Sequence, residues 1–195
     1  MRIFVALKLP PELAAAVNEQ AEPLRKKYPD FRWIREENLH ITLAFLGELD
    51  DPPLAILNEA VSLAVQKTHP VSLRTGKLFA IPRGRPANVL ALGIEQGKDL
   101  IAALAADVEK ILAEQGKQKH NLLRPPETRI FVPHITLARR GSIPLKISPE
   151  ERNNPILAQG TVNTLGVFKS DLGRNGPVYT LLAAYPLPVS GEYPR

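Results

Sequence analysis

The pentapeptide HITLA occurs twice in this chain of 195 residues, at positions 40–44 and again at positions 134–138. Its alternation of polar and apolar residues favours a β-strand in both places, because successive side chains of a strand point to opposite faces of a sheet. The two histidines lie 94 residues apart (134 − 40 = 94), so each copy falls in a different half of the chain. The repeat therefore favours a fold with two similar lobes, each containing one copy.

Each copy places one histidine and one threonine on the same face of its strand. In the first copy, strict alternation predicts a polar face made of His40, Thr42 and Ala44. The opposite face, made of Ile41, Leu43 and Phe45, is predicted to pack in the core. The second copy repeats this pattern with His134 and Thr136. An isolated His-x-Thr tripeptide is common on the solvated face of a half-buried sheet, and a duplication could preserve the pattern without function. Both alternatives stay open on the residues alone.

The rest of the chain alternates irregularly between predicted strands and predicted helices. Strands are predicted at 2–9, 71–81, 88–94, 161–169 and 178–186. Helices are predicted at 10–29, 50–68 and 98–115, and the proline-rich stretch up to residue 155 is expected to be irregular. Pro23 is expected to kink or shorten the first helix, and Gly116 to end the third. Several strand pairs have no helix between them, which favours an α+β fold with two mainly antiparallel sheets.

Composition narrows the class of protein further. The chain has no cysteine, which excludes disulfides, thiolate nucleophiles and cysteine-ligated zinc. It has no apolar run of the roughly 20 residues that a membrane-spanning helix needs, and its N-terminus lacks the features of a secretory signal. We therefore expect a soluble, cytoplasmic protein that forms one domain over residues 1–195. The formal net charge of +5 favours an anionic partner without identifying it.

The paired His-x-Thr faces suit acid–base chemistry at a phosphodiester. An imidazole with an unperturbed pKa of about 6.5 can act as a base when neutral and as an acid when protonated. Two such groups could take a proton from an attacking oxygen and give one to a leaving oxygen, while the threonine hydroxyls donate to oxygens that gain charge. The competing interpretation is a zinc site, but catalytic zinc takes three protein ligands, and neither histidine has others at metal-binding spacing.

Longer stretches around the pentapeptides resemble a known family. ENLHITLAFLGEL at 37–49 and PHITLARRG at 133–141 resemble the 2H phosphoesterase superfamily, specifically its branch of RNA 2′,3′-cyclic phosphodiesterases, also called 2′-5′ RNA ligases. MRIFVALKLP, KLFAIPRGRPANVLALGI and FKSDLGRNGPVYTLL stand in the order expected of that family, so the resemblance covers nearly the whole chain. It implies a bilobal, pseudo-symmetric α+β fold with helices on the outside and a central cleft, without metal or cofactor.

The resemblance also implies an activity and the residues that perform it. The family hydrolyses the 2′,3′-cyclic phosphate at an RNA 3′ end to a 2′-phosphate, with reversible 2′-5′ joining of RNA ends as a side reaction. Carried over, His40 would be the general acid that protonates the departing 3′ oxygen, and His134 the general base that activates water. Thr42 and Thr136 would bind the non-bridging phosphate oxygens. Local sequence leaves the acid and base roles interchangeable. The implied partner is RNA with 2′,3′-cyclic phosphate ends, tRNA fragments included, and the protein would be a monomer that binds no membrane.

Several arginines are candidates for binding the substrate. Arg139 matches a basic position of the family's second motif, although strand parity points it away from the His134 face. The first copy has Phe45 at the corresponding position. Further candidates for contacts with an RNA backbone lie between the predicted strands: Arg83, Arg85, Arg124 and Arg129. The alternative for each of these four is a solvated surface charge.

Other side chains have a structural interpretation beside a functional one. Trp33 and Phe79 could stack a base or pack in the core, and Tyr179 is expected to be a packing residue or a surface hydroxyl. Lys169 stands where family members often have an acidic residue. Two alternatives for the function stay open. One is the same chemistry on a small cyclic nucleotide or ADP-ribose cyclic phosphate, and the other is a nucleotide- or RNA-binding module without turnover.

Overall fold

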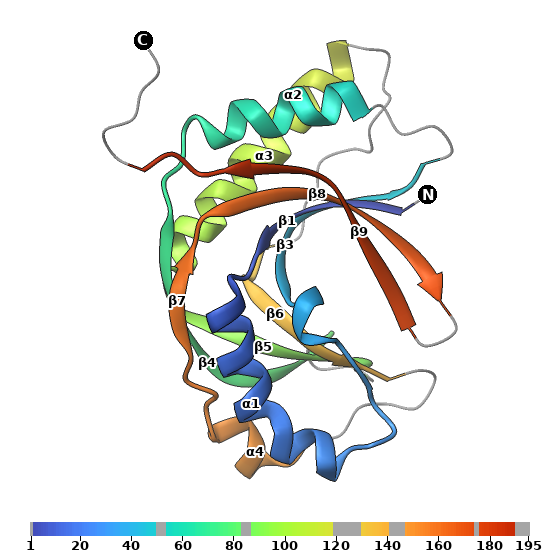
Figure 1. Ribbon diagram of the computed structural model, residues 1–195, viewed down its shortest axis with the longest axis vertical. Helices are drawn as coiled ribbons and strands as arrows, with labels where there is room; N and C mark the ends of the chain where they lie inside the picture. The colour runs from blue at the N-terminus through green and yellow to red at the C-terminus, as the bar shows by residue number, and fades with distance from the viewer. Residues whose placement is uncertain are drawn as a thin grey trace.

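Two antiparallel sheets form the framework of the molecule, and each contains one copy of the repeated pentapeptide (Figure 1). The computed structural model describes residues 2–49, 54–82, 87–118, 130–140, 147–173 and 176–189. Within these residues, the first sheet has the strand order β3 (His40–Glu48), β1 (Arg2–Lys8), β8 (Thr164–Gly173) and β9 (Gly176–Pro186). The second has the order β2 (Arg32–Trp33), β6 (His134–Arg139), β5 (Val89–Gln96), β4 (Val71–Ile81) and β7 (Gln159–Val162).

Helices cover the two ends of the molecule. In Figure 1, α1 (Pro11–Lys27) and α4 (Pro149–Asn153) lie at one end, and α2 (Leu54–Val65) and α3 (Lys98–Gln118) pack against each other at the other. α2 contacts β8 and β9, whereas α3 contacts β3, β4 and β5. None of the described helices is long and apolar enough to cross a membrane. The predicted α+β architecture of two mainly antiparallel sheets is confirmed.

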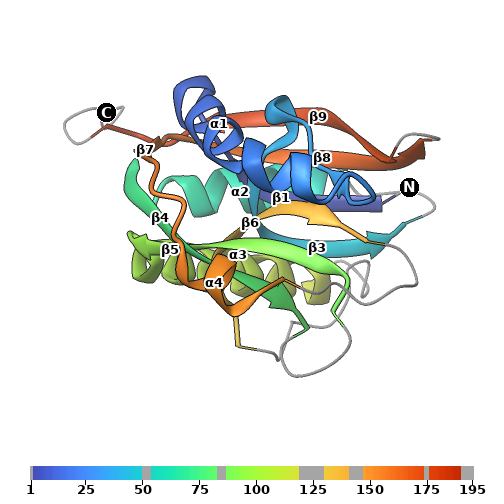
Figure 2. The same cartoon turned by 90° about the horizontal axis from the view of Figure 1, so that it is seen from below.

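Each pentapeptide strand lies at or next to an edge of its sheet, since β3 is an edge strand and β6 is followed only by the two-residue strand β2 among the described strands. β3 pairs with β1 in the first sheet, and β6 pairs with β5 in the second, both in antiparallel register. β3 and β6 also contact each other. Figure 2 shows them between β8 and β9 on one side of the molecule and β4 and β5 on the other. The fold therefore brings together two segments that lie far apart in the sequence, in the pseudo-symmetric arrangement that the repeat predicts.

Both pentapeptide strands contain a β-bulge at the same position. The register of β3 with β1 shifts by one residue at Leu43, and the register of β6 with β5 shifts by one residue at Leu137. A bulge leaves one residue of the longer strand without a cross-strand partner, and the alternation of faces is reversed after it. The two copies therefore share a backbone irregularity as well as a sequence.

The bulges overturn the strict alternation expected after the threonines. Ala44 is only 2% exposed, whereas Phe45 is 51% exposed. In the second copy Ala138 is fully buried and Arg139 is exposed. The prediction that Phe45 faces the core is wrong, and so is the parity argument that pointed Arg139 away from the His134 face.

Two helices extend past residues that the sequence predicts as limits. α1 continues through Pro23 to Lys27, so the predicted shortening at that proline is wrong. A proline removes one backbone hydrogen bond, but the buried side chains of Leu13 and Val17 on the same helix pack into the core and hold it in place. α3 likewise runs beyond Gly116, to Gln118.

Other element boundaries also differ from the prediction. The single strand predicted at 161–169 is divided at Asn163 into β7 and β8, which belong to different sheets. α4 lies in the stretch predicted to be irregular, and it begins with a capping box. The hydroxyl of Ser148 accepts a hydrogen bond from the backbone N–H of Glu151, whose carboxylate accepts one from the N–H of Ser148.

Candidate active site

The two histidines are held by the same local contact. Nδ1 of His40 lies 2.7 Å from the carbonyl oxygen of Asn38, and Nδ1 of His134 lies 2.8 Å from that of Val132. A carbonyl oxygen can only accept a hydrogen bond, so each Nδ1 carries a proton and donates it. The lone pair of each neutral imidazole is therefore on Nε2, which has no partner among the described side chains. Each ring offers Nε2 as a base or, once protonated, as an acid.

The threonines share the faces of the histidines and stand opposite small residues. Ala6 is opposite Thr42 in β1–β3, and Ala91 is opposite Thr136 in β5–β6. An alanine side chain fills little of the space across the strand from each hydroxyl, and both threonines are half-buried. Each sheet therefore offers one imidazole and one hydroxyl, roughly 6 to 7 Å apart along its strand.

Arg139 adds a positive charge to the His134 face. The cross-strand partners of His134, Thr136 and Arg139 are Gly93, Ala91 and Val89, every second residue of β5, so the three side chains share one face. The Arg139 guanidinium acts electrostatically on both histidines and lies within hydrogen-bonding reach of the Tyr179 hydroxyl. Because His40 and Tyr179 belong to the first sheet, Arg139 connects the two lobes at the site.

Aromatic rings of the first sheet surround His40. The ring centroids of Phe4, Tyr179 and Phe168 lie 5.0, 5.1 and 6.3 Å from the imidazole centroid. Tyr179 meets the imidazole edge-on at 89°, whereas Phe168 lies closer to parallel at 24°. Phe4 and Phe168 also stack on each other, with centroids 5.2 Å apart. This ring cluster fixes the plane of the imidazole and withdraws it from water.

The surroundings of both histidines disfavour the charged imidazole. Burial lowers the pKa of His40 to about 4, against the opposing effect of the Asn38 carbonyl and together with the positive charges of Arg139 and His134. Burial likewise lowers the pKa of His134, opposed by the Val132 carbonyl and assisted by Arg139. Both rings are therefore neutral near pH 7 without a ligand. A bound anion would favour their protonated forms.

Phe79 has a position beside His134 that resembles that of the aromatic rings beside His40. Its ring centroid lies 6.0 Å from the imidazole centroid, with the planes at 73°. Phe79 is half-buried on β4. Of the two roles expected from the sequence, packing is therefore observed, and the packing is against a site residue.

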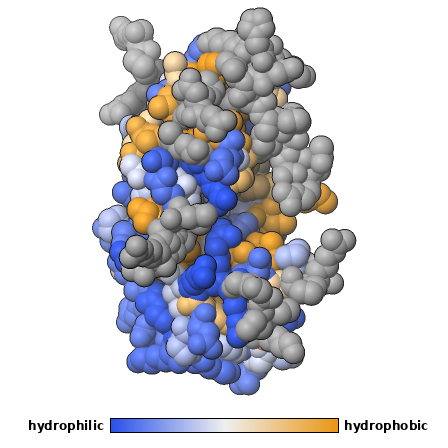
Figure 3. All heavy atoms as spheres, turned by 90° about the vertical axis from the view of Figure 1, so that its right-hand side faces the viewer, coloured by the Kyte–Doolittle hydropathy of each residue, from blue (hydrophilic) through white to orange (hydrophobic). Residues whose placement is uncertain are grey.

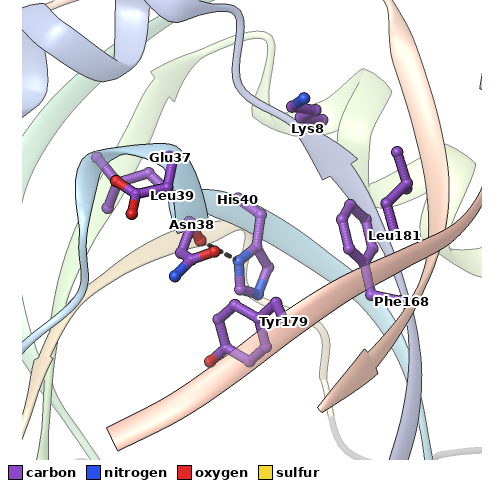
Figure 4. A pocket seen from close by; sticks show the side chains of 8 residues that line it. All are labelled: Lys8, Glu37, Asn38, Leu39, His40, Phe168, Tyr179 and Leu181. Carbon is purple, nitrogen blue, oxygen red and sulfur yellow. Dashed lines mark hydrogen bonds between the residues drawn. The ribbon is translucent and has the colours of Figure 1, made fainter. Parts of the chain in front are cut away.

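A pocket of about 230 Å³ opens beside His40. Figure 3 shows that hydrophilic side chains run as a band down the middle of one face of the molecule, beside apolar patches. The pocket has the same mixed character: Glu37 and Asn38 of the 3-10 turn η1 (Glu36–Asn38) lie on one side of the His40 ring, and Phe168 and Leu181 on the other (Figure 4). A ring with apolar faces and polar edges, such as a nucleobase, fits this chemistry.

Two other side chains named from the sequence have structural contacts, and four lie outside the described residues. Trp33 packs against the core, and its Nε1 donates a hydrogen bond to the carbonyl oxygen of Tyr28. Lys169 forms an ion pair of 2.9 Å with Asp171. Four of the predicted arginines lie outside the described residues: Arg83, Arg85, Arg124 and Arg129. The structure therefore brings together the two histidines, the two threonines and one of the arginines named from the sequence.

The donor set of the site suits an oxyanion. It consists of two imidazoles, two hydroxyls and a guanidinium, all of which can donate to phosphate oxygens. Across the described ranges, no three histidine, aspartate or glutamate side chains gather closely enough to hold a metal ion. The arrangement can hold an anion between two imidazoles, whose protonated forms the negative charge of that anion favours.

Comparison with known proteins places the chain in a family. Residues 7–90, which include the first pentapeptide, match the family described as LigT like Phosphoesterase. A protein of Thermus thermophilus named RNA 2′,3′-cyclic phosphodiesterase is 31% identical over 199 residues, covering 100% of this chain and 93% of that protein. The chain belongs to the LigT-like phosphoesterases.

Solved structures share the fold of this LigT-like phosphoesterase. A crystal structure of a protein from Thermus thermophilus superposes with a TM-score of 0.80 at 26% identity, covering 97% of this chain and 100% of that one. The crystal structure of E. coli LigT complexed with 3′-AMP superposes with a TM-score of 0.63 at 27% identity, covering 95% and 96% of the two chains. The two-sheet architecture is thus common to the family.

Sequence reasoning missed two aromatic residues beside His40 in this LigT-like phosphoesterase, Phe4 and Phe168. Tyr179 was expected to be a packing residue or a surface hydroxyl, and its ring packs against Phe4 and His40. A signal for Phe4 was present, because β1 alternates between a core face and a second face that carries Phe4 and Ala6. A large aromatic side chain on that second face requires something to pack against. The partner strands of β1 were not known from the sequence, so the cluster around His40 could not be assembled.

Proposed function

We propose that this protein hydrolyses the 2′,3′-cyclic phosphate at the 3′ end of RNA to a 2′-phosphate, with His40 as general acid and His134 as general base. The observation that carries the proposal is the matched pair of imidazoles, one from each lobe. Each is fixed through Nδ1, and its Nε2 makes no hydrogen bond to a described residue. Two such groups can serve the attacking and the leaving oxygen of one displacement at phosphorus. The name of the Thermus thermophilus relative points to the same substrate.

The proposed reaction is a single displacement. Nε2 of His134 takes a proton from water, whose oxygen attacks phosphorus while the bond from phosphorus to the 3′ oxygen breaks. Nε2 of protonated His40 gives its proton to that 3′ oxygen, so the products are a 2′-phosphate and a 3′-hydroxyl. The hydroxyls of Thr42 and Thr136 and the guanidinium of Arg139 donate to the non-bridging oxygens, where negative charge increases.

Substrate binding prepares the acid in this scheme. In the free protein the pKa of His40 is lowered to about 4 by burial, so the neutral ring predominates at pH 7. The negative charge of a bound cyclic phosphate favours the imidazolium and raises that pKa. His40 is thereby charged when it is needed as an acid, and no metal or cofactor takes part in a step.

The same site could join RNA ends. If the 5′-hydroxyl of a second RNA replaces water, His134 takes its proton, the 5′ oxygen attacks phosphorus, and the 3′ oxygen leaves with the proton of His40. The product is a 2′-5′ phosphodiester beside a free 3′-hydroxyl. Hydrolysis and joining therefore differ only in the attacking oxygen.

The decisive experiment is product analysis with an oligoribonucleotide that ends in a 2′,3′-cyclic phosphate, performed with EDTA present. A 2′-phosphate is expected, and a 3′-phosphate product would refute the assignment of the leaving oxygen. His40→Ala and His134→Ala should each lower the rate by about 10²- to 10⁴-fold while the melting temperature stays close to that of the wild type. Full activity in either variant contradicts the proposal.

Two further outcomes of the same experiment separate the alternatives. Turnover of a cyclic mononucleotide or of ADP-ribose cyclic phosphate, without turnover of the oligonucleotide, would favour a small-molecule phosphodiesterase. Binding of an RNA 2′-phosphate without conversion of the cyclic end would favour a binding module. Loss of activity in EDTA that zinc or magnesium restores would contradict a metal-independent reaction.

A further inference from the structure

Arg32 and Arg139 are direct cross-strand neighbours. They stand opposite each other in the antiparallel pair β2–β6, and the adjacent opposed pair is Trp33 and Ala138. Residues directly opposite each other point to the same face of a sheet, with Cβ atoms about 5 Å apart. Arg139 lies on the His134 face, so Arg32 lies on that face too, one strand farther from β5. Both arginines are exposed.

This pair of like charges is not neutralised by any carboxylate in the described part of the chain. None of the ion pairs there includes Arg32 or Arg139, and the neighbouring Arg35 is paired with Glu37 at 3.9 Å. Arg139 lies close to the hydroxyl of Tyr179, which is uncharged at neutral pH. Like charges directly opposite each other destabilise a sheet, so two guanidinium groups in this place indicate a bound anion.

The two arginines differ in their relation to the histidines. Arg139 acts electrostatically on both His40 and His134. Arg32 stands opposite Arg139 on the neighbouring strand β2, at the end of β6 away from His134, so its backbone is farther from His134 than that of Arg139 is. A phosphate held between the histidines is therefore within reach of Arg139 and is not the natural partner of Arg32. A ligand that uses both arginines has to carry a second phosphate.

We propose that Arg32 binds the phosphate one nucleotide before the cyclic end, so that the site selects an RNA chain over a cyclic mononucleotide. This inference rests on the proposed function, because it takes the reacting phosphate to lie between His40 and His134. β2 is the edge strand of its sheet, so a chain that leaves the site across Arg32 meets no further strand among the described residues. The planar guanidinium can bind two oxygens of one phosphate at once.

The test compares two substrates that differ by one phosphate: adenosine 2′,3′-cyclic phosphate and the same compound with a 5′-phosphate. The measured quantity is kcat/KM for the compound with the 5′-phosphate divided by kcat/KM for the compound without it. This ratio should exceed one for the wild type. Arg32→Gln should lower that ratio by about tenfold, the loss of one charge-assisted contact, and Arg32→Lys should give an intermediate ratio.

Arg74→Gln is the matched control for the change in net charge. Arg74 is half-exposed on β4 and is paired with Glu95 at 3.6 Å, so this variant should keep the wild-type ratio. The proposal is overturned if Arg32→Gln keeps the wild-type ratio, or if it lowers kcat/KM for the two substrates by the same factor.

A binding measurement makes the outcome independent of turnover. The affinity of a single-stranded tetraribonucleotide with a 2′-phosphate end is measured at several salt concentrations. Log affinity falls as log salt rises, and Arg32→Gln should make this fall less steep by about 0.7, the value for one phosphate contact on a single strand. Arg74→Gln should leave the steepness unchanged. A wild type that converts neither these two substrates nor a cyclic-phosphate oligoribonucleotide refutes the proposed function, while a reduced slope would still support the Arg32 contact. Turnover with an unchanged ratio and slope refutes the Arg32 contact alone.

Discussion

His40 and His134 expose the same ring nitrogen, because each donates its Nδ1 proton to the carbonyl oxygen two residues earlier. The tautomer is thus set by the backbone at the start of each strand, and no described carboxylate orients either ring. A neutral carbonyl fixes the orientation without adding the negative charge that would favour the imidazolium. This leaves burial as the main influence on both pKa values.

His40→Asn and His134→Asn test whether Nδ1 orients each ring while Nε2 transfers the proton. The asparagine amide can still donate a hydrogen bond from near the position of Nδ1, but it has no group at the position of Nε2. We expect each variant to lose activity on a cyclic-phosphate RNA by about 10²- to 10⁴-fold, as the alanine variants do. Thermal unfolding should show that the asparagine variants are at least as stable as their alanine counterparts. Retention of more than a tenth of the wild-type rate would contradict a role for Nε2.

The lowered pKa values predict an acidic optimum for the free enzyme. The profile of kcat/KM against pH reports the free protein, where the pKa of His40 is about 4 and that of His134 is also lowered. Its optimum should therefore lie below about pH 6.5, the ordinary pKa of histidine. The optimum of kcat, which reports the complex, should lie at higher pH because the bound phosphate stabilises the imidazolium. A kcat/KM optimum on the alkaline side of neutrality would contradict the burial effect.

Stability should depend on pH through the same group. The pKa of His40 is lowered in the folded protein, so between about pH 6.5 and 4 the unfolded chain binds a proton that the folded one does not. The contribution of neutral His40 to the free energy of unfolding is fully present above the unfolded pKa and is lost as the pH falls toward 4. Unfolding by urea from pH 7 to 4 should show a shallower decline for His40→Asn than for the wild type. Parallel declines would show that His40 does not cause the change.

Tyr179→Phe separates the two contacts of that side chain. The variant keeps the ring beside His40 and Phe4 but removes the hydroxyl from Arg139. We expect kcat/KM to fall by about 3- to 10-fold, the value of one hydrogen bond, with little change in melting temperature. The effects of Tyr179→Phe and Arg139→Lys should be less than additive in the double variant, because both disturb the same contact. Full additivity would show that Tyr179 does not position Arg139.

The repeated pentapeptide allowed much of the site to be predicted from the sequence. The histidines and threonines and their placement on strands follow from one short pattern, whereas their meeting across two lobes was implied by the resemblance to a known family. Strand parity failed at Ala44 and Ala138, because a bulge depends on how the neighbouring strand pairs, and the alternation of the letters alone does not report it. Arg139 was named as a candidate from the sequence, and the parity argument pointed its side chain the wrong way for that reason.

Other failures have a similar cause. Arg32 could be recognised only as the partner of Arg139, since β2 has two residues and no pattern of its own. The aromatic cluster around His40 comes from β1, β8 and β9, whose order in the sheet is a tertiary property. α4, in contrast, could have been found: Ser148 and Glu151 have the spacing of a capping box.

Glu151 provides a prediction about stability away from the site. Its carboxylate is only 12% exposed and accepts hydrogen bonds from Lys27 Nζ at 2.6 Å and from the Tyr28 hydroxyl and the Ser148 N–H, both at 2.7 Å, which ties the end of α1 to α4. Burial alone would raise the pKa of Glu151, but these hydrogen bonds outweigh it and lower the pKa to about 2. We expect Glu151→Gln to reduce the free energy of unfolding by about 1–3 kcal/mol at pH 7.

The pH dependence of that loss and a control variant make the prediction specific. Since the folded pKa of Glu151 is lowered, its contribution is present above about pH 4.5 and is lost as the pH falls toward 2, so the difference between wild type and Glu151→Gln should shrink over that range. Glu95→Gln removes a carboxylate from the exposed pair with Arg74 and should cost less than about 1 kcal/mol. Equal costs for the two variants in urea unfolding, or a difference that does not change with pH, would show that Glu151 behaves as an ordinary surface charge. Activity on a cyclic-phosphate RNA should be retained in both, because neither carboxylate belongs to the site of His40 and His134.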